Sequence, residues 1–270
     1  MEQLLLDNEP AVRLTVFLGL LLAMAGLEGA FPRRQRVQPR LRRWFANLAL
    51  VAIDTLAVRL AFFFLPALAV GVAAMAQISG FGLLHHLALP VWLEFVLALL
   101  VLDLAIWAQH LASHKIPLLW RLHRVHHADL DIDVTTALRF HPVEIVLSMA
   151  YKLAVIVLLG APPAAVLLFE VILNGAAMFN HANLNLPLWL DRILRMVIVT
   201  PDFHRVHHSV HPSETDSNYG FNLTLWDRLF GTACAQPRDG HTGMQIGLTP
   251  YRDGPRQGLV WMLVLPFRRS

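Results

Sequence analysis

Three histidine clusters hold the side chains best suited to chemistry. They have the spacings HxxxH, HxxHH and HxxHH and lie at 110–114, 123–127 and 204–208. On a helix, residues at i, i+3 and i+4 share one face, so each cluster presents its imidazoles in one direction. Neutral imidazole binds Fe, Zn, Cu and Ni, and eight imidazoles exceed what one ion can use. We therefore predict a two-metal site with the ligands His110, His114, His123, His126, His127, His204, His207 and His208.

The composition places this site at a membrane. The 270-residue chain is 56% hydrophobic and only 15% charged, whereas soluble domains have roughly 25% charged residues. The single cysteine, Cys234, excludes a disulfide framework, a Cys-rich zinc site and a thiolate-held iron–sulfur cluster. The chain is basic because arginines lie beside apolar segments, which indicates the cytoplasmic side of a bilayer and not nucleic-acid binding. These arginines are Arg33, Arg34, Arg36, Arg40, Arg42 and Arg43.

Several apolar segments could lie in the membrane, whose hydrocarbon core takes roughly 20 helical residues to cross. Residues 44–59 contain Asp54 and Arg59, so we expect a helix that lies partly in the interface. For the most N-terminal segment a signal peptide is the alternative, but acidic residues precede it and no small-residue cleavage site follows. We expect it to be a retained span. The predicted crossings are 11–31, 60–79 and 91–109.

Two shorter apolar segments, 145–159 and 164–179, flank Gly160-Ala161-Pro162-Pro163, a strong turn signal. They fit a hairpin that enters and leaves on one side better than two independent crossings. If the basic residues are cytoplasmic, all three clusters and the polar tail from residue 182 onward lie on that side. His85 and His86 fall on the other side. The predicted fold class is all-α: an integral membrane helical protein with three to five membrane segments and a cytoplasmic histidine-rich helical cap.

A nearly all-histidine ligand set restricts the chemistry. Two-metal hydrolases normally include bridging carboxylates, and zinc proteases of the HExxH type would need a motif that is absent here. Soluble di-iron bundle proteins use Glu-x-x-His pairs, and none occurs in this chain. Imidazoles at the surface of a membrane suit non-haem iron that activates O2 beside a lipid acyl chain or sterol ring.

The motif set resembles that of the fatty acid hydroxylase / sterol desaturase superfamily of membrane di-iron oxidases. The histidine pattern of that superfamily appears here as His110-Leu-Ala-Ser-His114, His123-Arg-Val-His-His127 and His204-Arg-Val-His-His208. Further matching elements are Arg139-Phe-His-Pro-Val-Glu144, Asn180-His-Ala-Asn183, Asn218-Tyr-Gly220 and Trp226-Asp-Arg-Leu-Phe-Gly-Thr232. The resemblance covers about 95 to 235. We therefore divide a single structural domain into N-terminal spans with the basic loop (1–90), a catalytic region (91–235) and a C-terminal tail (236–270).

The resemblance implies two irons held by the clustered histidines, with help from a histidine between the second and third clusters. His181 matches that position. Some members have a second histidine four residues later, where this chain has Asn185, so either the ligand set is reduced or a water replaces it. His141 is predicted to be either a metal ligand or a hydrogen-bond donor next to a metal ligand. Asp103 and Glu144 are candidates for orienting ligand histidines, because a ligating imidazole usually donates its other N–H to a carboxylate or carbonyl.

The resemblance also implies the reaction. O2, two ferrous ions and two external electrons together remove hydrogen from an unactivated C–H bond of a lipid, and the product is an alcohol or a double bond. The sequence favours neither outcome and does not identify the lipid. No cytochrome b5 element and no GxGxxG motif is visible, so we expect a separate electron-donor protein that the basic cytoplasmic face recruits. The membrane is expected to be a bacterial inner membrane.

Two other functions remain open: a histidine-rich metal transporter and a catalytically silent lipid-binding relative. Transporters place their sites near the bilayer midplane, whereas these clusters fall in polar stretches outside the predicted spans. Complete clusters argue against lost chemistry. Outside the clusters, we expect His85, His86 and His241 to be solvated and His211 to lie on the surface or beside a ligand. The segment from Trp226 to Thr232 is predicted to have a packing role that closes the cytoplasmic cap. Arg124 and Arg205 are predicted to face lipid headgroups or the cap.

Overall fold

The computed structural model describes residues 8–65, 68–252 and 258–268. Within these ranges its regular structure consists of helices and three isolated β-bridges, which confirms the all-α prediction. The longer helices are α2 (Glu9–Ala30), α3 (Arg40–Ala61), α4 (Leu68–Ser79), α5 (Val91–Lys115), α6 (Pro117–His127), α7 (Pro142–Leu159) and α8 (Pro163–Asn180). The shorter α-helices are α9 (Leu188–Leu194), α10 (Pro201–His207), α11 (Pro212–Thr215), α12 (Leu225–Leu229), α13 (Gly240–Gly243) and α14 (Leu259–Val264). Four 3₁₀ turns complete the set: η1 (Leu83–His86), η2 (Thr136–Leu138), η3 (Thr249–Tyr251) and η4 (Leu265–Phe267).

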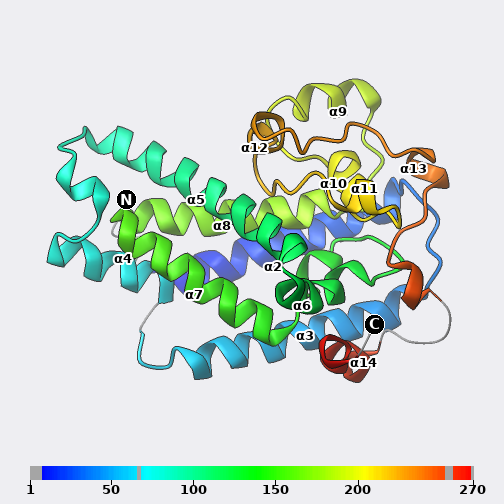
Figure 1. The fold of residues 1–270 in the computed structure, drawn as a ribbon, viewed down its shortest axis with the longest axis horizontal. Coiled ribbons are helices and arrows are strands. Elements are labelled where there is room, and N and C mark those ends of the chain that lie inside the picture. The colour runs from blue at the N-terminus through cyan, green and yellow to red at the C-terminus, as the bar shows by residue number, and fades with distance from the viewer. Residues whose placement is uncertain (1–7, 66–67, 253–257, 269–270) are drawn as a thin grey trace.

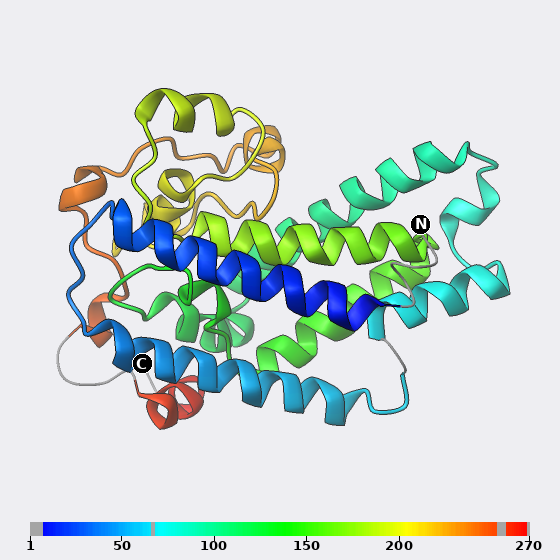
Figure 2. The same cartoon turned by 180° about the vertical axis from the view of Figure 1, so that it is seen from behind.

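The long helices form an elongated bundle with a cap at one end. Figure 1 shows α2, α3, α5, α7 and α8 running roughly along the long axis, with α6 and α9 to α14 gathered toward one end. The basic segment between α2 and α3 lies at the same end, as the view from behind shows (Figure 2). It is fastened there by a bridge between Pro32 and Leu184 and by a hydrogen bond of 3.1 Å from Arg33 N to Asn183 O. The cap therefore forms where the sequence predicted it.

Apolar side chains cover the outside of this bundle. Six helical segments of the described chain are long and apolar enough to cross a membrane, by length and composition: α2, α3, 68–86, α5, α7 and α8. Large aliphatic side chains are exposed along them, such as Leu22 at 70%, Leu60 at 66% and Leu158 at 66%. Soluble proteins rarely expose apolar surface on this scale. The chain is therefore an integral membrane protein, and its number of candidate spans exceeds the predicted three to five.

The predicted bounds of the segments 44–59 and 60–79 were wrong. The helix that contains 44–59, α3, continues unbroken for 22 residues and is long and apolar enough to be a candidate span. The chain turns directly after it and α4 begins only at Leu68, so 60–79 is not one crossing. The charged residues misled the prediction because their direction is a tertiary property. Asp54 is buried on the inward face of α3 and avoids lipid, and Arg59 lies near the helix end, where its long side chain can reach the interface.

The predicted reversal at residues 160–163 is present, but α7 and α8 are each long and apolar enough to cross the membrane, which the prediction disfavoured. α7 ends at Gly160, which has φ 70° and ψ 42°, a left-handed helix cap that favours glycine. Pro163 then starts α8, which returns to the cap end. A β-carbon on Gly82 would lie 2.3 Å from Gly160 Cα, so the segment before α5 and the hairpin turn meet at the end of the bundle away from the cap. His85 and His86 therefore lie at the opposite end from the three clusters, as predicted.

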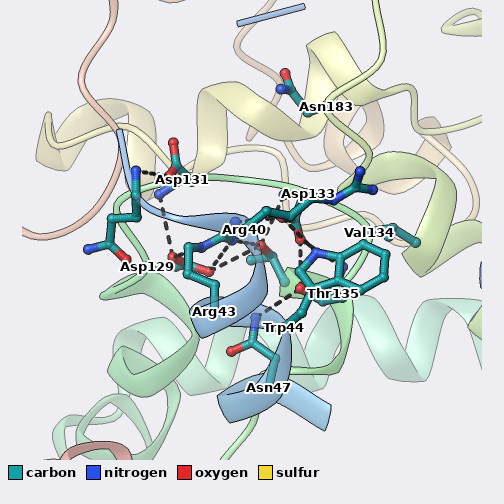
Figure 3. Close-up of polar contacts among 12 residues, drawn as sticks. Arg40, Arg43, Trp44, Asn47, Asp129, Asp131, Asp133, Val134, Thr135 and Asn183 are labelled. Carbon is teal, nitrogen blue, oxygen red and sulfur yellow. Dashed lines mark hydrogen bonds and ion pairs between the residues drawn. The ribbon is translucent and has the colours of Figure 1, made fainter. Parts of the chain in front are cut away.

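A buried ionic network fastens α3 to the segment that follows the second histidine cluster (Figure 3). Arg43 donates to both carboxylate oxygens of Asp129, at 2.9 and 2.7 Å, and also to Asp133. These three side chains are 0–2% exposed. Burial alone raises the pKa of Asp129, but Arg43 and Arg139 outweigh it and hold this pKa below its usual value. The carboxylate therefore stays ionised, and its charge is compensated inside the protein.

The helix α2 also holds the segment that follows the second histidine cluster. Glu28, near the end of α2, is fully buried and accepts hydrogen bonds from Val134 N at 2.6 Å and Asn183 N at 2.8 Å. On α3, Asn47 donates to Thr135 Oγ1 at 3.0 Å. Two transmembrane helices thus fix the backbone between the second histidine cluster and α7, and also the backbone that follows His181.

The architecture predicts which loops share a side of the membrane. In a Cys234→Ser background, the exposed positions Gln35→Cys and Asp239→Cys should react with a membrane-impermeant maleimide from the same side. His86→Cys should react only from the other side. Labelling of sealed vesicles of both orientations measures this. Reaction of Gln35→Cys and Asp239→Cys from opposite sides would contradict the arrangement of the cap.

The network predicts that substitutions of two adjacent arginines differ greatly in their effect on the free energy of unfolding. Arg43→Leu leaves two buried carboxylates without their partner and should lower the free energy of unfolding by about 3–5 kcal/mol. The matched change at the exposed neighbouring residue, Arg42→Leu, should lower it by no more than about 1 kcal/mol, because the contacts of an exposed charged side chain contribute little. Unfolding by SDS in mixed micelles measures both variants. Equal losses would show that the network does not stabilise the fold.

Candidate metal centre

A reversal between α5 and α6 places the first two histidine clusters. His110 and His114 lie one turn apart near the end of α5. Only Ile116 separates α5 from α6, and α6 begins with Pro117, whose missing N–H costs nothing at the first helical position. The helix α6 packs against the end of α5 and carries the second cluster in its last turns. As a result His110 Nε2 lies 3.1 Å from His123 Nε2.

The third cluster lies on α10, a short helix with strong start signals. Thr200 is its N-cap and accepts a hydrogen bond of 3.3 Å from Phe203 N, and Pro201 is the first helical residue. His204 and His207 occupy the helix and His208 its C-cap. A fourth source is the end of α8, where His181 is the C-cap.

These four segments bring nine histidines into two adjoining groups. In each group, one ring nitrogen of every member lies within 4.8 Å of those of the others. The first group holds His110, His114, His123, His127 and His207. The second holds His126, His181, His204 and His208. The groups touch, because the stacked rings of His127 and His208 have centroids 4.7 Å apart. The second and third clusters are therefore each divided between the groups.

The ring nitrogens have the separation that metal ligands require. A metal with nitrogen ligands at about 2.1 Å places neighbouring ligand nitrogens roughly 3.0–3.4 Å apart, for octahedral and tetrahedral geometry respectively. In the second group, the Nε2 atom of His181 lies 3.1 Å from the Nε2 atoms of both His126 and His204. His204 Nε2 in turn lies 3.3 Å from His208 Nε2. All of these distances, and the 3.1 Å pair in the first group, fit ligand edges.

Hydrogen bonds on the other side of the rings define which nitrogens lack a proton. His110 Nδ1 donates to Tyr219 O at 2.7 Å, and His123 Nδ1 donates to Glu144 Oε1 at 2.6 Å. In the neutral ring each Nε2 is then a bare lone pair, and these two lone pairs lie 3.1 Å apart. They repel each other unless a cation binds between them. The residues therefore fit a metal ion.

Two further histidines are held in the same way. His207 Nδ1 donates to Ser217 O at 2.6 Å, and His181 Nδ1 donates to Ala177 O at 2.8 Å. Several other ring nitrogens in the groups are buried without a hydrogen-bond partner in the described structure, including both nitrogens of His114, Nε2 of His127 and Nε2 of His207. Buried polar atoms are normally satisfied. Metal coordination would satisfy the nitrogens that converge in each group.

Burial keeps these imidazoles neutral at pH 7. It lowers the pKa of His181 to about 4 and that of His207 to about 3. Burial, followed by repulsion from neighbouring imidazolium charges, also lowers the pKa values of His126, His127, His204 and His208 well below their usual value. Neutral imidazole is the form that binds a metal. These six imidazoles are thus in their ligand form before any ion arrives.

A loop and a short helix hold the backbone acceptor of His110 in place. Asp227 on α12 accepts hydrogen bonds from Tyr219 N at 2.9 Å and from Gly220 N at 2.8 Å. It also accepts one from Trp107 Nε1 on α5, at 3.0 Å. A β-carbon on Gly220 would lie 2.9 Å from Asp227 Oδ2, so a larger residue would separate these partners. The predicted packing segment from Trp226 to Thr232 therefore also positions Tyr219 O, a role that sequence reasoning missed.

Three residues predicted to lie at or beside the metals are placed elsewhere. The carboxylate of Asp103 accepts a hydrogen bond from Trp226 Nε1 at 2.8 Å and orients no ligand histidine. His141 is the N-cap of α7, where its Nδ1 accepts from Val143 N and its Nε2 lies 3.2 Å from Leu263 O. Asn185 is exposed and accepts from Arg33. Neither His141 nor Asn185 belongs to either histidine group. Glu144, by contrast, contacts a histidine of the first group as expected.

Residues outside the groups follow the predictions in part. His211 lies near the surface, with Nε2 2.7 Å from Asp239 Oδ2. His241 was predicted to be solvated, but it is buried 3.6 Å from Asp202 Oδ2, and burial lowers its pKa to about 4. Arg124 donates to Leu265 O at 2.6 Å and Arg205 to Asp202, so both are held within the cap.

Sequence reasoning overlooked the acidic residues that hold the second cluster. The alternating carboxylates Asp129, Asp131 and Asp133 follow directly after it. Asp131 accepts from the backbone N–H groups of Val37 at 3.0 Å and Gln38 at 2.9 Å, so it fastens the basic loop. A run of three alternating aspartates in an apolar chain is a readable signal of such a role, because isolated buried charges are unfavourable.

Comparison with known proteins agrees with this geometry. A family model described as fatty acid hydroxylase matches residues 95–232. The chain is 30% identical over 181 residues to ornithine lipid hydroxylase OlsE of Rhizobium tropici, covering 67% of this chain and 52% of that protein. It is 30% identical over 152 residues to human cholesterol 25-hydroxylase, covering 56% and 52%. It is 28% identical over 142 residues to human alkylglycerol monooxygenase, covering 50% and 29%.

The chain thus spans about half or less of the length of these relatives. No solved structure matches it. The family match, however, includes the whole segment from near the start of α5 to the end of the Trp226–Thr232 element and all nine grouped histidines. Because this match covers just over half of the residues, the chain belongs to the fatty acid hydroxylase family.

Proposed function

We propose that this protein is a membrane-bound non-haem di-iron oxidase that uses O2 and external electrons to hydroxylate or desaturate a C–H bond of a lipid. The observation that carries the proposal is the approach of His110 Nε2 and His123 Nε2 to 3.1 Å at the end of a membrane helix, with Nδ1 of each ring held by a hydrogen bond. The second histidine group repeats this close approach of ring nitrogens. The relatives that are hydroxylases and monooxygenases of ornithine lipid, alkylglycerol and cholesterol support redox chemistry on lipids, of the sterol or fatty acyl type.

In this proposal the first histidine group holds one iron and the second holds the other. The irons supply O2 activation when bound. Glu144 and the carbonyl of Tyr219 fix the tautomers of His123 and His110, so that Nε2 faces the ion. Ala177 O and Ser217 O do the same for His181 and His207. Such partners also raise the basicity of the ligand and tune the metal.

A lipid substrate can reach this site from the membrane. A cavity of about 200 Å³ is lined by both His110 and His123, together with side chains of α5, α7 and α8. All three of these helices are candidate spans. The reacting carbon would therefore be presented inside the protein, away from bulk water.

The alternatives are less well supported. A metal transporter would need ion sites along a path through the spans, whereas both histidine groups lie at the cap end and are closed by α6 and α10. A catalytically silent lipid-binding relative would not need two sets of four or more buried ring nitrogens at ligand spacing.

We further propose that the cap faces the cytoplasm, that the membrane is a bacterial inner membrane and that a separate protein supplies electrons. The six arginines between residues 33 and 43 lie at the cap end, and a basic segment beside a span marks the cytoplasmic side. Several of these arginines already make contacts inside the protein. Arg33 pairs with Asp202, Arg34 donates to backbone carbonyls and Arg43 pairs with Asp129. Recruitment of the donor would therefore depend on the remaining exposed charge of the cap.

The ligand assignment predicts a selective loss of iron. His127→Ala in the first group and His208→Ala in the second should each lower the content from about two irons per chain to about one, because each ion loses a ligand. Both variants should lose O2-dependent turnover. Elemental analysis of the purified protein measures the iron, and gel filtration checks the fold. His86→Ala, at the opposite end of the bundle, is the control. The assignment fails if this control loses as much iron as the two cluster variants.

The reaction class predicts the fate of oxygen. Turnover should require O2, iron and a reductant together, and hydroxylation should place one atom of ¹⁸O2 in the lipid. Desaturation would place none and would still consume O2. Mass spectrometry of the lipids and an oxygen electrode distinguish these outcomes. A hydrolase takes its oxygen from water, so undiminished lipid turnover under strict anaerobiosis would refute the proposal.

A further inference from the structure

The cavity beside His110 and His123 is polar for a space enclosed by membrane helices. Glu144, Ser148 and Lys152 occupy positions i, i+4 and i+8 of α7, and all three line the cavity. These positions share one helix face and extend over about 12 Å along the axis. Gln109 on α5 lines the opposite wall and donates to Ser148 Oγ at 2.8 Å. A cavity shaped for a plain alkyl chain would have no need of this polar stripe.

Charged side chains close this cavity, here called the inner cavity, at the end away from the histidines. Lys152 pairs with Glu170 on α8, which also pairs with Arg13 on α2. The Glu170 side chain is 4% exposed, so the carboxylate is buried between two cations. The cavity volume of about 200 Å³ lies below the roughly 300–1,000 Å³ of pockets that hold whole ligands. Only part of a lipid therefore fits beside the histidine groups, and the paired charges of Lys152 and Glu170 lie at this end of the cavity.

An outer cavity of about 350 Å³ adjoins the inner one and has a different lining. The two share Gln109, Ser113, Glu144 and Ser148. The rest of the outer lining is mainly apolar and includes Leu147 and Tyr151, which are 47% and 38% exposed on the outward side of α7. An acyl chain can therefore occupy the outer cavity and reach the bilayer, while the inner cavity receives another part of the same molecule.

Two hydrogen-bond acceptors stand unpartnered at the junction of the cavities. Gln109 Oε1 and Glu144 Oε2 are both buried and have no hydrogen-bond partner within the described structure. The other amide end of Gln109 is already used by Ser148, and the other carboxylate oxygen of Glu144 by His123. A buried acceptor without a hydrogen bond is energetically unfavourable. A ligand that donates a hydrogen bond to each atom would remove this cost.

We propose that the substrate is a lipid whose polar group donates hydrogen bonds, through a hydroxyl or an N–H, and that this group binds between Gln109 and Glu144 beside the metals. Its acyl chain then extends through the outer cavity into the bilayer. This inference rests on the proposed lipid oxidation and deepens it, because it places the oxidised carbon at or next to the polar group and not in the middle or at the end of the chain. Gln109 is the residue that selects the polar end.

The binding test compares two probes of equal chain length, 1,2-hexadecanediol and 1,2-dimethoxyhexadecane, which differ in their two hydroxyl donors. The probe bound to the iron-loaded full chain, kept anaerobic and without reductant so that nothing turns over, is measured by mass spectrometry after gel filtration. The diol should bind at least about 10-fold more tightly, as expected for hydrogen bonds to acceptors that are otherwise unsatisfied. Equal binding of the two probes would overturn the proposal.

Substitutions of Gln109 test whether this residue causes the preference for the diol. Gln109→Leu should remove most of the preference for the diol, whereas Gln109→Glu, which keeps an acceptor, should retain it. Gln77→Leu, on the exposed side of α4, is the matched control and should leave it unchanged. Unchanged iron content shows that each variant is folded. A preference that survives in folded Gln109→Leu, or that is lost equally in Gln77→Leu, would contradict the role of Gln109.

The second test maps the product. The wild-type protein is supplied with a polar lipid extract, reductant and ¹⁸O2, and tandem mass spectrometry locates the label or the new double bond. We expect it on the carbon that bears the polar group or on its neighbour. A modification at mid-chain or at the chain end would refute this inference and leave the proposed oxidation intact. Lipids without any modification would instead refute the oxidation, and the diol comparison would still decide the binding site.

Discussion

Nine buried histidines converge in two groups, and this crowding of ring nitrogens governs how the surrounding segments must be held. Ring nitrogens approach to 3.1–3.3 Å in both groups. Where a hydrogen bond places the proton on Nδ1, as in His110 and His123, the facing Nε2 lone pairs repel each other. A bound cation would relieve this repulsion, and a fixed backbone keeps the rings together. The fold supplies rigid attachments for the backbone around the clusters.

These attachments share one device, a buried polar side chain that satisfies backbone groups of a neighbouring segment. Asp227 accepts from Tyr219 N and Gly220 N, and so fixes the carbonyl that His110 contacts. Glu28 does the same for the backbone near Val134 and Asn183, which follow the second cluster and His181. Because a buried hydrogen bond to a charged group is stronger than one between neutral groups, each attachment resists displacement.

The protein is apolar on the outside and charged within. The bundle exposes leucine, valine and phenylalanine along its spans, whereas Arg43, Asp129, Glu28 and Glu170 are almost completely buried. Each of these charges has a partner of opposite sign, since an unpaired charge in the interior is strongly destabilising. The arginines of the basic segment belong to the same pattern, because several of them compensate internal aspartates. Their role is therefore structural in part, beyond any contact with lipid headgroups.

Features that depend on local geometry could be predicted from the order of the residues. The i, i+3 and i+4 spacing is enough to place the histidines of each cluster on one helix face, and apolar length and Gly160 with its two prolines predict the spans and the α7–α8 hairpin. The resemblance to the family motifs made His181 a ligand candidate, and the usual pairing of ligand imidazoles with carboxylates made Glu144 a candidate partner. These features depend on neighbours within about one helical turn or on a motif that can be read in order.

Contacts between residues far apart in the chain became visible only in the folded protein. The tertiary structure divided the second and third clusters between two groups, directed Asp103 to Trp226 instead of a histidine, and made His141 a helix cap. It also turned Asp54 inward, away from the exposed side of α3. The physical reason is that the direction of a side chain around a helix acquires meaning only when a second helix packs against it. Rotation and pairing are set by long-range contacts, and no local pattern records them.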